Sequence, residues 1–201
     1  KKNTRSADFH RADGSTQQVQ MMRLRDTFRC ASSDVCDYLE MDYGNHAFSM
    51  VIMLPKDGKT TRDVIAMMDG KKWADAIQSL TLKEIHVLLP RFKAECEYPM
   101  HEHILPDMGM KLPFNPMLAD LSGIADVTGL YISKVIHKTF VQVDEEGTEA
   151  AAVTSVEMVL MSLPVDKKEP VLFRVDRPFV FAICEKSTGV ILFIGEIGEI
   201  Q

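Results

Sequence analysis

The sequence is poor in cysteine and lacks the cysteine patterns of metal-binding and redox proteins. Only four cysteines occur among its 201 residues, at Cys30, Cys36, Cys96 and Cys184. They form no C-x-x-C pair and no zinc-ribbon spacing. Cys30 and Cys36 could form a disulfide, but four free thiols agree with the spacing at least as well. The cysteines therefore leave the redox compartment open.

Long apolar runs and an excess of positive charge are also absent. The best apolar run, Phe48 to Pro55, has the length of a strand and is too short to span a membrane. Lys and Arg number 23 against 29 Asp and Glu, a net charge of −6 that gives no reason to expect nucleic acid. The N-terminus has a basic start without the apolar core of a signal peptide, and is typical of the middle of a chain. We expect no membrane, nucleic acid or cofactor partner.

Turn residues and alternating patterns predict a β-rich α+β fold with several sheets. Asp13-Gly14-Ser15 indicates one hairpin, and Gly44-Asn45 indicates a second between strands at 36–43 and 48–55. Residues 61–79 have helical spacing broken at Gly70, which predicts two short helices. The other predicted elements are a long strand over 83–98 with an edge or bulge at Pro90, a short helix from Pro99 to near Gly109, a long strand over Leu130–Asp144, and strands at 171–175, 178–185 and 190–197. No break in composition marks a domain boundary, so we expect residues 1–201 to belong to one domain.

Motifs for catalysis or metal binding are weak. His101 and His103 flank Glu102, but residues two apart do not share a helix face and no third ligand is apparent. Ser162 lacks the G-x-S-x-G context of a hydrolase nucleophile. We therefore expect no metal site at these histidines and no hydrolase nucleophile at Ser162.

Three segments together resemble the serpin family of serine protease inhibitors. They are "NPMLADLSGIAD" (115–126), "EEGTEAAAVT" (145–154) and "FRVDRPFVFAI" (173–183), and they occur in the family's order. "FHRADGSTQQVQMM", "MVIMLPKDGK" and "LPRF" extend the resemblance over essentially the whole chain. It covers only the C-terminal half of the family's fold and implies that the helical N-terminal half is absent here. Since a half-built central sheet leaves unpaired backbone groups along an edge, we expect an N-terminal fragment of the same protein as a partner.

The resemblance implies a reactive loop over about residues 145–170. Its hinge would contain Glu145, Gly147, Thr148, Ala150, Ala151 and Ala152. In an extended strand, alternate side chains share a face, and the face that carries Thr148, Ala150 and Ala152 continues to Met158 without a charge. This pattern is consistent with a segment that inserts into the central sheet after the chain is cut.

Counting along the loop from Gly147, as the family does, places the scissile bond at Met161–Ser162. An unbranched apolar residue at the cut suits elastase-, chymotrypsin- or subtilisin-like proteases. The segment from Ser162 to Phe173 is longer than is usual in the family, so Lys167–Lys168, which would suit trypsin-like enzymes, and Leu160–Met161 remain alternatives.

Two further residues are matched to the family's pattern. His137 matches a histidine beneath the opening central sheet, and Glu145 matches an acid that pairs with a basic residue, here Arg91, near the insertion point. The resemblance thus implies a metastable, single-use inhibitor that traps serine endopeptidases, and cysteine endopeptidases as a further class, as the acyl-enzyme. The alternative is a non-inhibitory carrier, chaperone or storage protein. An extracellular or cell-surface location is expected, with the cytoplasm as the open alternative.

Overall fold

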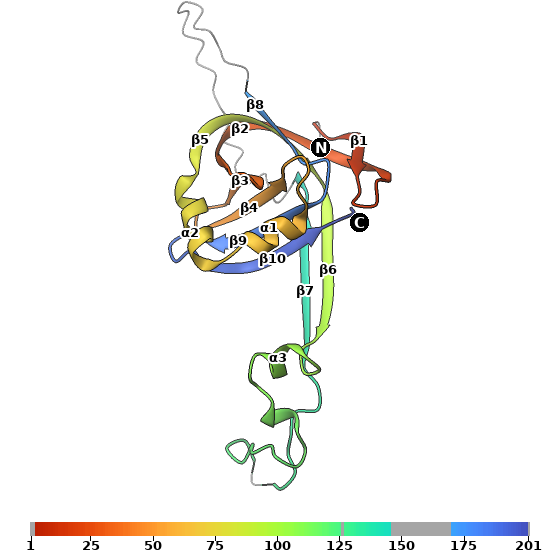
Figure 1. Cartoon of the computed structure of the whole chain (residues 1–201), viewed down its shortest axis with the longest axis vertical. Coiled ribbons are helices and arrows are strands. Elements are labelled where there is room, and N and C mark those ends of the chain that lie inside the picture. Colours follow the sequence, from red (N-terminus) through yellow and green to blue (C-terminus); the bar gives the residue numbers. More distant parts are fainter. Residues whose placement is uncertain (1–2, 126, 146–169, 201) are drawn as a thin grey trace, which may run out of the picture. The chain divides into compact units, whose positions relative to one another are not determined.

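The computed structural model describes residues 3–125, 127–145 and 170–200. These residues form an α+β structure that is rich in strands (Figure 1). They divide into two compact units, residues 1–93 with 142–201 and residues 94–141. The expectation of one domain over the whole chain stays a prediction. No helix in the described ranges is long and apolar enough to cross a membrane.

The larger unit is built on an eight-stranded sheet. The strand order is β10-β9-β4-β3-β2-β5-β8, and β1 also pairs with β2. β8 runs parallel to its neighbour, β5, whereas the pairs β1–β2, β2–β3, β2–β5, β3–β4, β4–β9 and β9–β10 are antiparallel. The strands are β1 (Arg5–His10), β2 (Thr16–Ser32), β3 (Cys36–Tyr43), β4 (Phe48–Pro55), β5 (Thr81–Pro90), β8 (Val171–Arg174), β9 (Phe179–Glu185) and β10 (Ile191–Ile197).

Both predicted hairpins are confirmed. β1 and β2 are joined through a turn in which Gly14 has φ = +83°, a conformation that glycine adopts at little cost. β3 and β4 pair over their full lengths, from Cys36 opposite Pro55 to Tyr43 opposite Phe48. β4 is buried from its second residue onward because it lies between β3 and β9 and packs on both faces. Its continuous apolar sequence follows from that central position.

Two helices cover one face of this sheet near β4. Helix α1 (Thr61–Met67) begins with a capping box between Thr60 and Asp63, and α2 (Gly70–Ser79) begins at Asp69, whose side chain accepts a hydrogen bond from the Lys72 backbone N–H. The break between them therefore falls at residues 68–69, just before Gly70. The core beneath these helices contains Cys36, Tyr38, Val51, Met53, Val64, Leu80, Val180, Ala182 and Cys184.

The smaller unit contains most of a two-stranded sheet formed by β6 (Phe92–Pro99) and β7 (Ile136–Val143). Between these strands lie a four-residue helix, α3 (Ile104–Asp107), and a 3₁₀ turn at Leu112–Phe114. The prediction of a helix from Pro99 to Gly109 is wrong at its start, because Pro99 is the last residue of β6 and the helix begins five residues later.

Two long predicted strands are shorter in the structure. Residues 83–98 do not form one strand, because the chain leaves the eight-stranded sheet after Pro90 and enters the β6–β7 sheet at Phe92. The strand predicted over Leu130–Asp144 is confined to Ile136–Val143. β6, its neighbour in the sheet, has only eight residues, and a strand extends only where it finds a pairing partner.

Candidate functional site

The predicted site at the start of the loop contains an ion pair between two residues that each follow the end of a strand. Arg91 is the first residue after β5, and Glu145 lies two residues beyond β7. The distance between Arg91 Nη2 and Glu145 Oε1 is 2.5 Å. Thr4, just before β1, also donates its hydroxyl to the same carboxylate oxygen. Three segments that are distant in sequence thus meet at the Glu145 carboxylate.

The backbone fixes Arg91 in this position. Its N–H donates to the Gln20 carbonyl of β2 at 2.9 Å, which anchors the residue beside the eight-stranded sheet. The Glu145 side chain is only 14% exposed, against 37% for the side chain of Arg91. The carboxylate is therefore the more enclosed partner.

The electrostatics of the pair favour its charged form. The hydrogen bond from Arg91 lowers the pKa of Glu145 to about 2; burial opposes the shift and the Thr4 hydroxyl adds to it. The hydrogen bond to Glu145 likewise raises the pKa of the Arg91 guanidinium. Glu145 is thus ionised at any physiological pH, so the ion pair with Arg91 keeps both of its charges.

The other end of the predicted loop is fastened to the same strand. β8 begins at Val171 and pairs in parallel with β5, with Val171 opposite Ile85 and Phe173 opposite Val87. Phe173 is buried, and the Val175 N–H donates to the Leu88 carbonyl at 2.8 Å. Before residues 146–169 the chain is therefore attached to Arg91, the residue after β5, and after them it is attached to β5 itself.

Most of the predicted loop residues lie outside the described residues. This applies to Gly147, Thr148, Ala150, Ala151, Ala152, Met161 and Ser162, and to the alternative scissile bonds at Leu160–Met161 and Lys167–Lys168. Their roles stay predictions. The structure does bring together Arg91 and Glu145, the two predicted residues that lie within the larger unit and are described.

His137 lies on β7 and is exposed. Its side chain makes no hydrogen bond within the described ranges, whereas the adjacent Lys138 forms an ion pair with Glu97 at 2.8 Å. The role of His137 beneath a central sheet stays a prediction.

The histidines at 101 and 103 and the four cysteines all lie within the described residues. His101 Nδ1 lies 3.2 Å from the Val135 carbonyl oxygen. No group of three or more potential ligands that could hold a metal ion occurs among the described residues. All four cysteines are free, and only Cys96 is exposed.

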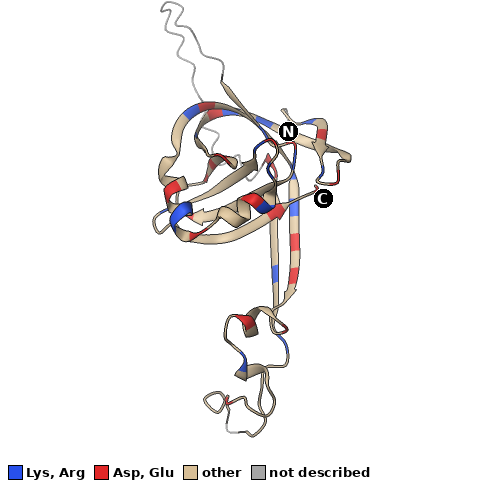
Figure 2. Cartoon of the chain, in the orientation of Figure 1, with Lys and Arg blue, Asp and Glu red and all other residues tan. Residues whose placement is uncertain are grey.

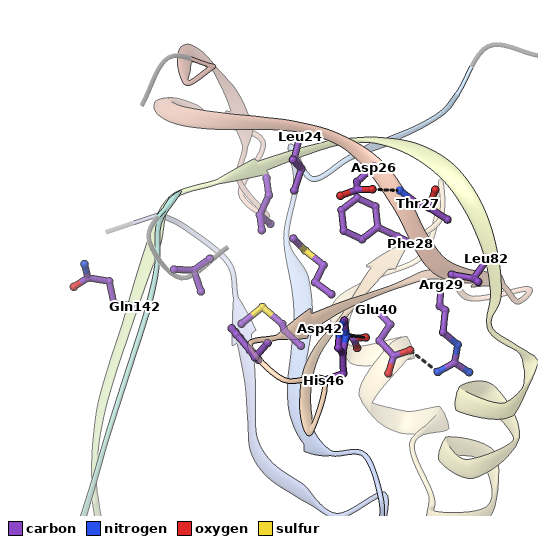
Figure 3. A pocket seen from close by; sticks show the side chains of 15 residues that line it. Leu24, Asp26, Thr27, Phe28, Arg29, Glu40, Asp42, His46, Leu82 and Gln142 are labelled. Carbon is purple, nitrogen blue, oxygen red and sulfur yellow. Dashed lines mark hydrogen bonds and ion pairs between the residues drawn. The ribbon is translucent and has the colours of Figure 1, made fainter. Parts of the chain in front are cut away.

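A pocket between β2, β3 and the end of β7 was not predicted from the sequence. Its volume is about 350 Å³, and Figure 3 shows side chains from these strands around it. Much of its lining is apolar and includes Leu24, Phe28, Met41, Met50, Leu89 and Val143. A space of this size and character could hold a small apolar molecule or the apolar side chains of another segment.

One wall of this pocket contains an ion pair whose carboxylate is buried. Glu40 is 4% exposed, and its Oε2 lies 2.5 Å from Arg29 Nη1, as the dashed line in Figure 3 marks. Ser49 donates its hydroxyl to the other carboxylate oxygen at 3.0 Å. The pair follows from the sheet register, which places Arg29 of β2 directly opposite Glu40 of β3. The available sequence signal was a carboxylate between Leu39 and Met41 in an otherwise apolar stretch of strand.

The network continues to the rim of the pocket. Lys186 approaches Asp42 at 2.5 Å, and His46 Nδ1 lies 2.8 Å from the other oxygen of Asp42. Burial alone would raise the pKa of Asp42, but the hydrogen bonds from Lys186 and His46 outweigh it and hold that pKa below its ordinary value. These charges are mutually compensated, so the network stabilises the wall of the pocket.

Comparisons with known proteins show the relatives of this chain. The family model described as "Serpin (serine protease inhibitor)" matches residues 1–200. An uncharacterized serpin-like protein of Thermococcus kodakarensis is 37% identical over 194 residues, which cover 96% of this chain and 44% of that protein. Leukocyte elastase inhibitor A of Rattus norvegicus is 36% identical over 207 residues, covering 98% of this chain and 53% of the inhibitor. The chain thus spans about half the length of the curated relatives it matches.

Solved structures agree with the sequence relatives. Native tengpin, a thermophilic serpin, superposes with a TM-score of 0.81 at 32% identity, over 100% of this chain and 51% of that one. Thyroxine-binding globulin in complex with thyroxine superposes with a TM-score of 0.83 at 28% identity, over 99% of this chain and 51% of that one. The relatives therefore include both a protein named as a protease inhibitor and a protein named for binding a small molecule.

Proposed function

Because the chain belongs to the serpin family over residues 1–200, we propose that it is the C-terminal part of an irreversible inhibitor of serine endopeptidases. Cysteine endopeptidases are a further target class. In this proposal the chain has no enzymatic activity of its own. It presents residues 146–169 to a protease and is consumed in the encounter.

The attachment of the chain to β5 and to Arg91, the residue after it, on the two sides of residues 146–169 is the observation that carries this proposal. The Arg91–Glu145 ion pair fixes the leading end just after β5, and β8 fixes the trailing end along β5 itself. A loop held at both ends cannot travel far while it is intact. Cutting it near Met161 would free the leading part, whose uncharged face from Thr148 to Met158 suits insertion as a new strand.

The chemistry of trapping follows from acyl transfer. The protease serine would attack the Met161 carbonyl, and the bond to Ser162 would break to leave an acyl-enzyme. Insertion of the freed segment would then pull on the attached protease. Loss of a single oxyanion-hole donor typically slows such enzymes by about 10²–10³-fold, which is sufficient to stall deacylation.

The proposal includes a partner and a location. An N-terminal portion of the same protein supplies the remaining strand beside which the loop inserts. The protein acts outside the cell or at the cell surface, where elastase-, chymotrypsin- and subtilisin-like proteases are accessible targets.

Denaturing gel electrophoresis tests the proposal directly. The protein with its N-terminal portion is mixed with an elastase-type protease, and a covalent adduct that survives denaturation is expected. The peptide released from the C-terminal side should begin at Ser162. A Met161→Arg variant should form its adduct with a trypsin-type protease instead. Clean cleavage without adduct would contradict the trapping mechanism.

A non-inhibitory carrier is the second candidate function, with chaperone or storage roles in the same class. The apolar pocket beside Glu40 favours it, as does the similarity to thyroxine-binding globulin. Saturable binding of an apolar fluorescent probe, lost when Met50 is changed to Trp, together with no adduct on the gel, would select this candidate over the inhibitor.

A further inference from the structure

A cluster of basic side chains lies where β1, β2 and β5 meet. Arg5, Arg23, Arg25 and His86 line a cavity of about 240 Å³ together with Asn3 and Leu24. No carboxylate is among these lining residues. Basic residues recur along β2 (blue in Figure 2), although the chain as a whole carries a net charge of −6. The cavity is therefore a local positive site on an acidic protein.

Strand register explains why these side chains converge. Arg25 of β2 is directly opposite His86 of β5, and Arg5 of β1 is opposite Met21 of β2. Because alternate side chains of a strand share a face, Met21, Arg23 and Arg25 point to the same side of β2. Their cross-strand partners Arg5 and His86 share that side. The cluster is thus built into the sheet and does not depend on the conformation of a loop.

The charges in this cavity are only partly neutralised within the chain. Glu84 accepts hydrogen bonds from the Nε and Nη2 of Arg25 at 2.9 and 2.7 Å. Arg5 and Arg23 form no ion pair with any residue that the structure describes. The Nε of Arg23 is buried and has no hydrogen-bond partner there. A buried donor on a charged group without an acceptor is costly, and a bound anion would supply the missing acceptor.

A neighbouring cavity provides an internal comparison. Arg23 also borders a space of about 510 Å³ that is lined by Arg174, His10, Asp8 and Asp176. There, Arg174 Nε lies 3.2 Å from Asp176 Oδ2, so the basic group already has an acidic partner. The second cavity balances its own charge. The cavity between Arg5 and Arg25 has no carboxylate in its lining, and an anion bound there would neutralise its basic groups.

We propose that this cavity binds a tetrahedral oxyanion, namely a sulfate or phosphate group, either as the free ion or as an ester on a larger molecule. A guanidinium presents its N–H groups in a planar fork that matches two oxygens of such an anion. Arg23 would satisfy its unpaired Nε in this way, while Arg5 and His86 contact the remaining oxygens. The proposal is independent of protease inhibition.

Isothermal titration calorimetry with inorganic phosphate and inorganic sulfate, at low ionic strength, tests this proposal. Arg23→Gln should weaken binding by about tenfold or more, as expected for the loss of a charge-assisted hydrogen bond. Arg5→Gln provides a second variant should Arg23→Gln fold poorly. Arg62→Gln is the matched control, because Arg62 is exposed on α1 and does not line the cavity. Its affinity should equal that of the unmodified protein.

A parallel titration with phenyl phosphate distinguishes the two sources of the anion. Tighter binding of the ester than of phosphate assigns the site to an esterified ligand, and equal binding assigns it to the free ion. Absence of saturable binding by phosphate, sulfate and the ester would overturn the proposal. So would an equal loss of affinity in Arg23→Gln and Arg62→Gln.

Discussion

Arg91 Nη2 and Glu145 Oε1 are 2.5 Å apart, although 54 positions separate the two residues in the chain. The contact joins the end of β5 to the residues that follow β7, and Thr4 adds a third segment. Since β8 is also paired with β5, this strand holds the chain on both sides of residues 146–169. The segments on both sides of residues 146–169 are therefore attached to β5 or to Arg91, the residue directly after it.

Removing the charge of Glu145 should weaken this attachment. Glu145→Gln keeps the shape of the side chain but loses the ion pair, and we expect the free energy of unfolding to fall by about 1 kcal/mol. Glu84→Gln is the matched control, because the Arg25–Glu84 pair has both side chains more than half exposed. That change should cost less than about 0.5 kcal/mol in the same urea titration. An equal loss of stability in the two variants would contradict the prediction that the Arg91–Glu145 pair stabilises the fold more than the exposed pair does.

Acid should release the same contact. The pKa of Glu145 is lowered from about 4.5 to about 2 by its hydrogen bond with Arg91. A depressed pKa means that the folded state holds the carboxylate ionised, so its contribution is fully present above pH 4.5. That contribution should be lost as the pH falls from about 4.5 to about 2. NMR titration of the Glu145 side-chain carboxyl measures its pKa in the folded protein, and a midpoint near 4.5 would contradict this prediction.

Breaking the Arg29–Glu40 pair, in which Glu40 is buried, should cost more than breaking an exposed pair. Arg29→Met would leave the buried Glu40 carboxylate with the Ser49 hydroxyl and with Lys186, whose Nζ lies 3.7 Å away, as its remaining partners. We expect a loss of about 3 kcal/mol in the free energy of unfolding, because removing the nearest charged partner of a buried carboxylate is strongly destabilising.

Arg25→Met provides the comparison for this variant, since it removes the same side chain from an exposed pair and should cost less than about 1 kcal/mol. Urea denaturation of both variants measures the difference. Similar losses in the two would show that burial of Glu40 contributes little.

Gly195, in β10, should not tolerate a larger side chain. A Cβ at this position would lie 2.6 Å from Cε1 of the Phe181 ring on the neighbouring strand β9. Because Phe181 is packed in the core against Phe92, the ring cannot move aside freely. Gly195→Ala should lower the free energy of unfolding by about 1–3 kcal/mol.

Gly198→Ala is the control for crowding at Gly195. Nothing lies within 4 Å of a Cβ at Gly198, so the change should leave the midpoint of thermal unfolding nearly unchanged. If both substitutions lower the midpoint equally, crowding against Phe181 is not the cause.

Local signals in the sequence predicted the hairpins and the two short helices well. Gly14, Gly44 and the capping residue Asp69 act within a few positions, so their effect is visible in the sequence. The lengths of β6 and β7 were not predictable in this way. They depend on which strand lies alongside, and Pro90 marks a change of sheet that its own residue type cannot specify.

The candidate site likewise contains contacts that local sequence signals cannot predict. The Arg91–Glu145 pair was expected only because the chain resembles a known family, since no local pattern links positions so far apart. Glu40 with Arg29, and Arg25 with His86, depend on strand register and became visible only in the structure. Charged residues inside apolar strands are a signal that partners exist, but they do not identify those partners.

The most direct test of the central claim is denaturing electrophoresis of Thr148→Arg after incubation with an elastase-type protease. Thr148 lies at the start of the uncharged face that is proposed to enter the sheet. A charged side chain there should block entry, so that the variant is cleaved without forming an adduct while the unmodified protein forms one. Equal amounts of adduct from both proteins would contradict the account.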